Sequence, residues 1–166
     1  MALQVQYASP GVAVETLFYV QFFVPGQPIP KGSKRAIARP GCRPVIIEDY
    51  KRTKPWAKAI RYKALQAMAD RSFEMSTESV EVSIIFWLSR PKGLSRKVSA
   101  MTKKPDIDKL VRNVLDALTG VVYRDDALVV RLVVEKSYAD GSLYTGALVR
   151  VRSFLGLRLG HAQVTQ

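Results

Sequence analysis

Two kinds of apolar repeat alternate along the chain. Runs rich in β-branched and aromatic residues predict strands over residues 16–24, 80–89, 127–138 and 143–152. The dipeptide Asp140–Gly141 lies between the last two runs and is a hairpin-turn signal. We therefore expect residues 143–152 to return as the strand beside residues 127–138.

Apolar residues at three- and four-residue steps predict two helices between these strands. The first runs from about Asp49 to Asp70, although Pro55 is expected to delay its start. The second lies within residues 105–120, where Gly120 is a natural stop. The order strand, helix, strand, helix, strand, strand predicts an α+β fold, in which two main helices pack on a single mixed β-sheet.

The segments outside these elements divide the chain. Residues 1–15 are expected to be a flexible leader, 16–153 a single domain and 154–166 a C-terminal tail. Residues 25–48 are rich in proline and predict a long loop. No apolar run is long enough to span a membrane, and the leader lacks the basic start of a secretory signal. We therefore expect a protein of the reducing cytoplasm.

The charge balance narrows the classes of partner. Lys plus Arg number 26 and Asp plus Glu 14, so the net charge is +12. Such an excess indicates a polyanionic partner, either nucleic acid or an anionic membrane surface. A single cysteine, Cys42, and a single histidine, His161, exclude a disulfide framework, Cys-rich zinc folds and histidine-based triads. Any chemistry must come from carboxylates, Lys, Arg, Tyr or hydroxyl groups.

Two basic segments, within the loop 31–43 and the connector 90–104, are the expected contacts to phosphates, and each contact would add to a steep salt dependence. The alternative is a solvated cationic surface. Trp56 lies among basic residues and could stack on bases, but we expect it in the core. The residues assigned to DNA binding are Lys31, Lys34, Arg35, Arg90, Lys92, Arg96, Lys97, Lys103, Lys104 and Lys109.

Five aspartates stand out in this basic sequence. Asp106 and Asp108 are two residues apart and share a face if that stretch is extended; Asp125 and Asp126 follow the second helix, and Asp116 lies between the pairs. Clustered carboxylates without His or Cys suit Mg²⁺, which prefers oxygen ligands. Metal-assisted phosphodiester hydrolysis would explain why acids lie inside a basic surface.

Each acid also has a structural explanation. Asp108 could cap the second helix, Asp116 could pair with Arg112 four residues before it, and the Asp125–Asp126 pair could be a polar turn. From the spacing alone, a metal site and these structural roles both remain open.

The stretch KPDIDKLVRNVLDALTGVVYRDD, residues 104–126, closely resembles the central motif of the RusA family of Holliday junction resolvases. That motif consists of a basic residue followed by Pro-Asp-x-Asp-Asn-Leu-x-Lys, then Asp-Ala-Leu-x-Gly, and an aromatic residue shortly before Asp-Asp. The segment FVPGQPIPKGSKRA also resembles the opening strand and Pro/Gly loop of the family. The resemblance extends over about residues 20–150.

The resemblance implies a homodimeric endonuclease that cuts four-way DNA junctions by paired symmetric nicks. It implies Mg²⁺ as cofactor, with Mn²⁺ as a substitute, no small-molecule cofactor, and a bacterial or phage-infected cytoplasm. By position, Asp106, Asp108 and Asp126 are the implied metal ligands and catalytic acids, and Asp125 is the implied assisting ligand next to them. Asp116 matches the aspartate of Asp-Ala-Leu, for which a structural role is expected.

Two positions depart from the family motif. Arg112 replaces a lysine important for activity, and Lys109 replaces an asparagine beside the implied metal site. Arg112 or Lys109 is expected to stabilise charge on the phosphoryl oxygens. The departures leave open a catalytically weak or inactive branched-DNA-binding protein with structural acids. An anionic-membrane binder is disfavoured, because the basic first helix bears few large apolar residues on its other face.

Overall fold

The computed structural model describes residues 19–32, 35–37, 45–47, 50–98, 100–139 and 144–154, with residues 35–37, 45–47 and 50–52 described by their backbone alone. The predicted helices and the four predicted strands are present, with bounds shifted by a few residues. Along the chain the elements are β1 (Tyr19–Pro25), β2 (Arg35–Ile37), β3 (Val45–Ile47), α1 (Tyr50–Ala69), β4 (Val80–Leu88), α2 (Ile107–Leu118), the short 3₁₀ helix η1 (Asp126–Leu128), β5 (Val129–Tyr138) and β6 (Gly146–Ser153).

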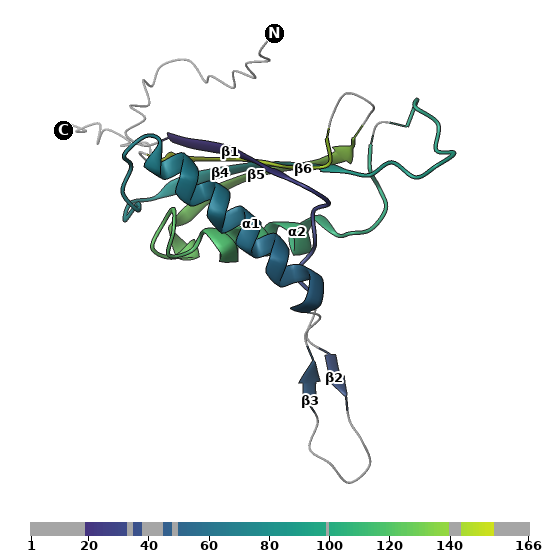
Figure 1. Ribbon diagram of the computed structural model, residues 1–166, viewed down its shortest axis with the longest axis horizontal. Helices are drawn as coiled ribbons and strands as arrows, with labels where there is room; N and C mark the ends of the chain where they lie inside the picture. Colours follow the sequence, from purple (N-terminus) through teal and green to yellow (C-terminus); the bar gives the residue numbers. More distant parts are fainter. Residues whose placement is uncertain are drawn as a thin grey trace, which may run out of the picture.

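A mixed four-stranded sheet forms the body of the molecule, and both helices pack on the same face of it (Figure 1). The strand order is β1-β6-β4-β5. β6 runs antiparallel to both β1 and β4, whereas β5 runs parallel to β4. The predicted α+β fold with one main mixed sheet and two main helices is confirmed.

The predicted hairpin between the last two strands is wrong. β5 and β6 are separated by β4 and do not pair. The reason lies in the preceding connection, since the chain passes from β4 through α2 to β5 as a crossover that lays β5 parallel beside β4. β6 pairs antiparallel with the other edge of β4, and β1 pairs antiparallel with the far edge of β6.

The predicted long loop over residues 25–48 contains a small hairpin. β2 and β3 pair antiparallel with Ala36 opposite Ile46, and Figure 1 shows them projecting from the helical side of the sheet, beyond the start of α1. α1 begins at Tyr50, so Pro55 lies inside the helix and does not delay its start. No helix in the described ranges is long and apolar enough to cross a membrane.

The core lies between the sheet and the two helices. Alternate strand residues such as Phe22 and Ile84 face the helices, and Ile60 of α1 and Leu110 of α2 pack against them with almost no exposure. Trp56 is also buried, which confirms its expected place in the core. This packing holds α2 against the sheet next to β5, where the candidate acids lie.

Candidate functional site

The start of α2 divides the first pair of candidate acids. Asp106 has extended backbone angles (φ −69°, ψ 140°) and is the N-cap, whereas the helix begins at Ile107 and Asp108 lies in its first turn. The predicted shared face required an extended stretch through both residues, and this condition fails. Asp108 lines a cavity between α2 and β5, whereas Asp106 lines a separate cavity beside the proline-rich loop.

The cavity between α2 and β5, hereafter the acidic cavity, has a volume of about 380 Å³. Asp108 and Asp116 reach it from α2, and Asp126 reaches it from η1. Arg112 lies between the two helical acids, because residues four apart on a helix share a face. The strand β5 supplies an apolar wall through Leu132 and Val134. Three carboxylates and one guanidinium therefore share one open cavity.

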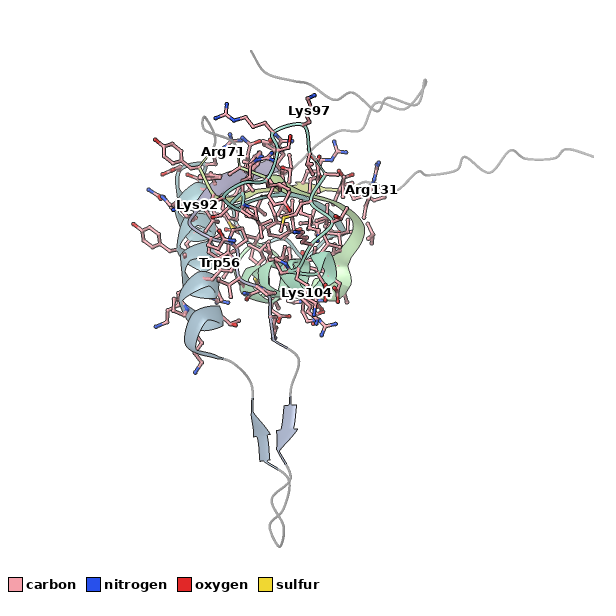
Figure 2. All side chains as sticks on the ribbon, turned by 90° about the vertical axis from the view of Figure 1, so that its right-hand side faces the viewer. Trp56, Arg71, Lys92, Lys97, Lys104 and Arg131 are labelled. Atoms are coloured by element: carbon pink, nitrogen blue, oxygen red, sulfur yellow. The ribbon has the colours of Figure 1, made fainter. Side chains whose placement is uncertain are left out.

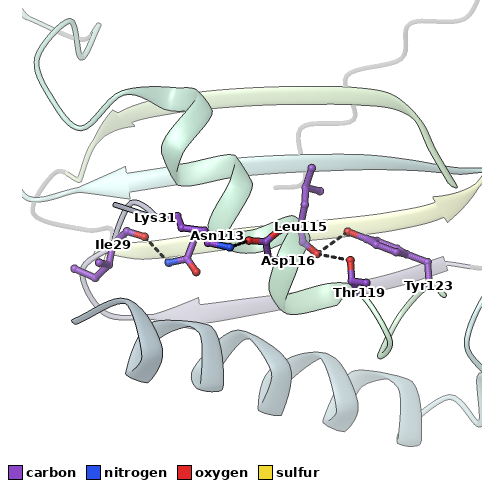
Figure 3. Close-up of polar contacts among 7 residues, drawn as sticks. All are labelled: Ile29, Lys31, Asn113, Leu115, Asp116, Thr119 and Tyr123. Carbon is purple, nitrogen blue, oxygen red and sulfur yellow. Dashed lines mark hydrogen bonds and ion pairs between the residues drawn. The ribbon is translucent and has the colours of Figure 1, made fainter. Parts of the chain in front are cut away.

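A buried phenol lies near two of these carboxylates. Tyr123 has no exposed surface, and its hydroxyl donates a hydrogen bond to the carbonyl of Leu115 (3.2 Å; Figure 3). Burial raises the pKa of Tyr123 well above its usual range, and the nearby charges of Asp126 and Asp116 raise it further. Asp126 thus lies toward the C-terminal half of α2, whereas Asp108 is eight residues, or about 12 Å of helix, from Asp116.

The predicted convergence of Asp106, Asp108 and Asp126 is therefore absent from this structure. Among the described residues, no group of three or more Asp, Glu, His or Cys side chains is close enough to hold a metal ion. Asp106 is turned away by the helix start, and Asp108 and Asp126 are spread along the acidic cavity. Asp108 and Asp126 do share that cavity, as the family motif led us to expect.

The proline-rich loop brings a cation to the acidic cavity. Asn113 is buried in α2 and donates to the carbonyl of Ile29 (2.7 Å), and the amide of Lys31 donates to the carbonyl of Lys109 (2.9 Å). These bonds hold the loop on α2, and the Lys31 ammonium forms an ion pair with the Asp116 carboxylate (Figure 3). The alternative pair between Asp116 and Arg112 is not found among the described residues.

A second cation neutralises Asp106. The Lys109 Nζ lies 3.2 Å from an Asp106 carboxylate oxygen, with both side chains close to half exposed. This pair and Lys104 line the second cavity, which has a volume of about 400 Å³. From β5, the Lys136 ammonium donates to the carbonyls of Lys103 (2.9 Å) and Pro105 (2.8 Å), which fixes the chain just before α2.

Asp125 has a local structural role. Its carboxylate accepts a hydrogen bond from the amide of Ala127 (2.8 Å) and caps η1. Unlike its neighbour Asp126, it does not line the acidic cavity. The polar-turn explanation accounts for this contact, and a role in metal binding stays a prediction.

The connector after β4 presents most of the predicted phosphate contacts. The guanidinium of Arg90 donates to the carbonyls of Ser95 and Val98 (both 3.0 Å) and lies 4.9 Å from the centre of the Tyr138 ring. Arg90 therefore orders this loop. The other basic side chains of the connector are exposed and can reach a ligand; Figure 2 labels Lys92, Lys97 and Lys104 among them. These side chains are Lys92, Arg96, Lys97, Lys103 and Lys104.

Two of the predicted DNA contacts are not placed by the structure. Lys34 and the side chain of Arg35 lie outside the described residues. The DNA-binding roles of all ten predicted residues stay predictions.

Three residues gained importance only in the structure. Asp116 was expected to be structural, yet it lines the acidic cavity and meets Lys31. The sequence did contain a signal for this position of Asp116: it lies eight residues after Asp108, a spacing that places both side chains on one face of the helix. Asn113 and Tyr123 gave no comparable signal, because an amide or a phenol in an apolar stripe is usually only a core residue.

Comparisons with known proteins place the chain beside one family and one relative. Residues 25–151 match the family described as Endodeoxyribonuclease RusA. The chain is also 30% identical over 131 residues to the uncharacterized protein YqaN of Bacillus subtilis (strain 168), an alignment that covers 73% of this chain and 89% of that protein. The family match covers all the candidate acids and both cavities.

Proposed function

The chain belongs to the RusA endodeoxyribonuclease family, and on that premise we propose that it resolves four-way DNA junctions by metal-dependent paired nicks as a homodimer. The observation that carries the proposal is the acidic cavity: it gathers Asp108, Asp116, Asp126 and Arg112 on a protein whose net charge is +12. Acids would repel a phosphate backbone unless a cation screened them.

The donor set of the acidic cavity fits a hard divalent cation such as Mg²⁺. The cavity offers carboxylate oxygens and no sulfur or imidazole donors from the described residues, and it is open to solvent. Asp108 and Asp126 would hold the ion. When bound, a divalent cation lowers the pKa of a water molecule and neutralises charge on the phosphoryl group.

To hold the same ion, Asp106 would have to turn from the second cavity and give up its present partner. Its side chain makes no capping hydrogen bond, and its ion pair with Lys109 is about half exposed. Such a pair is worth about 0–1 kcal/mol, so exchanging Lys109 for a divalent ion costs little. We therefore keep Asp106 in the proposed ligand set, with the exchange of partner as an added step.

The cations around the site are proposed to position DNA. Arg112 lies between Asp108 and Asp116, where its guanidinium can stabilise charge on the phosphoryl oxygens. Lys92, Arg96 and Lys97 project from the loop that Arg90 orders, and they would hold the arms of the junction through phosphates. Two copies related by a two-fold axis would offer two equivalent sites to a junction of similar symmetry.

A cleavage assay on a synthetic four-way junction tests the proposal. We expect paired nicks with Mg²⁺, none without it, and little cleavage of a linear duplex of the same sequence. Asp126→Asn should bind the junction at least as tightly and leave it uncut. Cleavage by Asp126→Asn at the wild-type rate would overturn the assignment of the site.

A second candidate, a branched-DNA-binding protein without catalysis, is favoured by one observation. Two of the acids are already neutralised, Asp106 by Lys109 and Asp116 by Lys31. If this candidate is correct, the junction is bound in a salt-sensitive manner and no concentration of Mg²⁺ or Mn²⁺ produces nicks.

A further inference from the structure

The outer edge of β5 is an unpaired strand next to the acidic cavity. β5 is 10 residues long and is the last strand of the sheet, so only β4 pairs with it among the described strands. Its C-terminal end is covered, because Ala100 bridges Ser137 and Lys136 bonds to the connector. From Val129 to Glu135 the described part of the chain pairs no strand with the outer edge. A bare edge of this length is a template for another strand.

The exposed side chains of this edge are mostly apolar. Val130, Leu132 and Val133 are 55%, 43% and 49% exposed. Edge strands that stay unpaired are usually protected by Lys or Pro at their centre. Here the centre, residues 130–134, carries no Lys or Pro, and its one charged residue, Arg131, is paired with Glu81 within the chain, which favours a further strand on this edge.

The charges of the strand fit a second copy of the same strand. In an antiparallel pair, directly opposite residues point to the same face of the sheet. A two-fold axis between two identical strands must therefore pass between the two copies of one residue. An axis at Val133 puts Arg131 opposite Glu135 of the second copy, and Leu132 opposite Val134, each contact occurring twice. An axis one residue away, at Leu132 or Val134, removes the ion pairs.

Arg131 is placed to make this contact. Its guanidinium lies 3.3 Å from the buried carboxylate of Glu81 on β4, yet the side chain remains half exposed. Figure 2 shows Arg131 on the side of the molecule away from α1. It can bridge Glu81 within the chain and Glu135 of another copy.

We infer that two copies of this chain pair through their β5 strands, antiparallel about an axis at Val133, into one continuous sheet. The inference rests on the proposed function, because it identifies the surface of the proposed homodimer. It brings the two sites together, since Asp126 lies just before β5 and Leu132 and Val134 line the acidic cavity. Paired strands lie about 4.8 Å apart, so the two acidic cavities would flank the axis.

Sedimentation of the full chain, without DNA or metal, measures the pairing. We expect a dimer at tens of micromolar, and Val133→Lys should raise its dissociation constant by at least about tenfold, because a buried lysine pair repels at the axis. Leu65→Lys is the matched control: Leu65 is a similarly exposed aliphatic residue on α1 (56%), and its replacement should leave the dimer unchanged.

Single cysteines in a Cys42→Ser background test the register. Val133→Cys should form a disulfide-linked dimer by itself, because opposite Cα atoms lie about 4.5–5.5 Å apart. Arg131→Cys and Glu135→Cys should each stay uncrosslinked alone and crosslink when the two variants are mixed. Arg152 still pairs with Glu81 in the Arg131 variant (2.9 Å).

A monomeric wild-type protein would overturn the inference, and so would a dimer that survives Val133→Lys and gives no crosslink in the Val133→Cys variant. These readouts need neither DNA nor metal. A β5-paired dimer that never cuts a junction would refute the nuclease proposal alone, whereas an active nuclease without β5 pairing would refute the pairing alone.

Discussion

Two cavities of similar volume flank the start of α2, and they differ in how their acids are neutralised. The acidic cavity contains Asp108, Asp116 and Asp126, of which Asp116 alone forms an ion pair within the described part of the chain. The second cavity contains Asp106 with Lys109 paired to it. One helix start thus places Asp106 and Asp108 in different cavities, the first in an ion pair with Lys109 and the second in no ion pair with a described residue.

The family motif specifies which acids are present, but it does not specify which of them lie close together in the folded chain. A side chain at an N-cap leaves the chain in another direction from one in the first helical turn. In the acidic cavity Asp108 and Asp126 form no ion pair with a described residue, whereas Asp116 is paired with Lys31, and the acid of the second cavity is paired with Lys109.

Removing the charge of Asp108 or Asp126 should have the largest effect. Either change to Asn should reduce junction cleavage by at least about 100-fold, because these carboxylates would hold the cation that neutralises charge on the phosphoryl group. Junction binding should be unchanged or tighter. Asp70→Asn, an exposed acid just after α1, is the control and should cleave normally.

Asp106→Asn decides whether the two cavities stay separate in the working enzyme. We expect it to abolish cleavage as well, because Asp106 leaves Lys109 for the cation. Near wild-type cleavage by this variant, together with inactive Asp108 and Asp126 variants, would show that Asp106 serves only at the helix start. Gel assays of single-turnover cleavage distinguish the two results.

Asn113→Leu should loosen the loop that carries Lys31 to Asp116. The buried amide donates to the carbonyl of Ile29, which would be left unsatisfied, at a cost of about 1–3 kcal/mol in the free energy of unfolding. Denaturant unfolding measures the loss. An unchanged unfolding midpoint would mean that water forms a hydrogen bond to the Ile29 carbonyl in place of Asn113, and that the other contacts of the loop hold it on α2.

Lys109→Asn restores the family residue and removes the partner of Asp106. The concentration of Mg²⁺ that gives half-maximal cleavage should fall by about threefold to fivefold, since an exposed ion pair is worth up to about 1 kcal/mol. Lys104→Asn is the matched control, because Lys104 lines the same cavity without an ion pair to a described residue. Equal effects of both variants would point to general charge and not to the Asp106 pair.

Tyr123→Phe should have the smallest effect, and it acts through pH. Because the pKa of Tyr123 is raised in the folded protein, its contribution to stability is complete below about pH 10, the unfolded value, and is lost as pH rises above it. The variant should lose about 1 kcal/mol at neutral pH with the bond to Leu115, and should show a flatter decline in unfolding free energy above pH 10. Tyr62→Phe, an exposed tyrosine, is the control.

The sequence alone was sufficient to predict the two helices and four strands of the main body, and the kinds of functional group available for chemistry. Alternating apolar residues specify the strands and a 3.6-residue repeat specifies the helices, because both periods arise from local backbone geometry. The same holds for the acids and the excess of cations, which need no folding to be counted. The family motif in residues 104–126 likewise lies in one continuous stretch.

Tertiary structure alone decided the neighbours. The place of β5 beside β4 follows from a crossover that packs α2 on the sheet, and a local turn signal could not oppose it. Lys31 meets Asp116 across 85 residues of sequence because Asn113 holds the loop on α2. Asp106 and Asp108 separate because the helix begins between them. Such contacts depend on long-range packing, which no local period encodes.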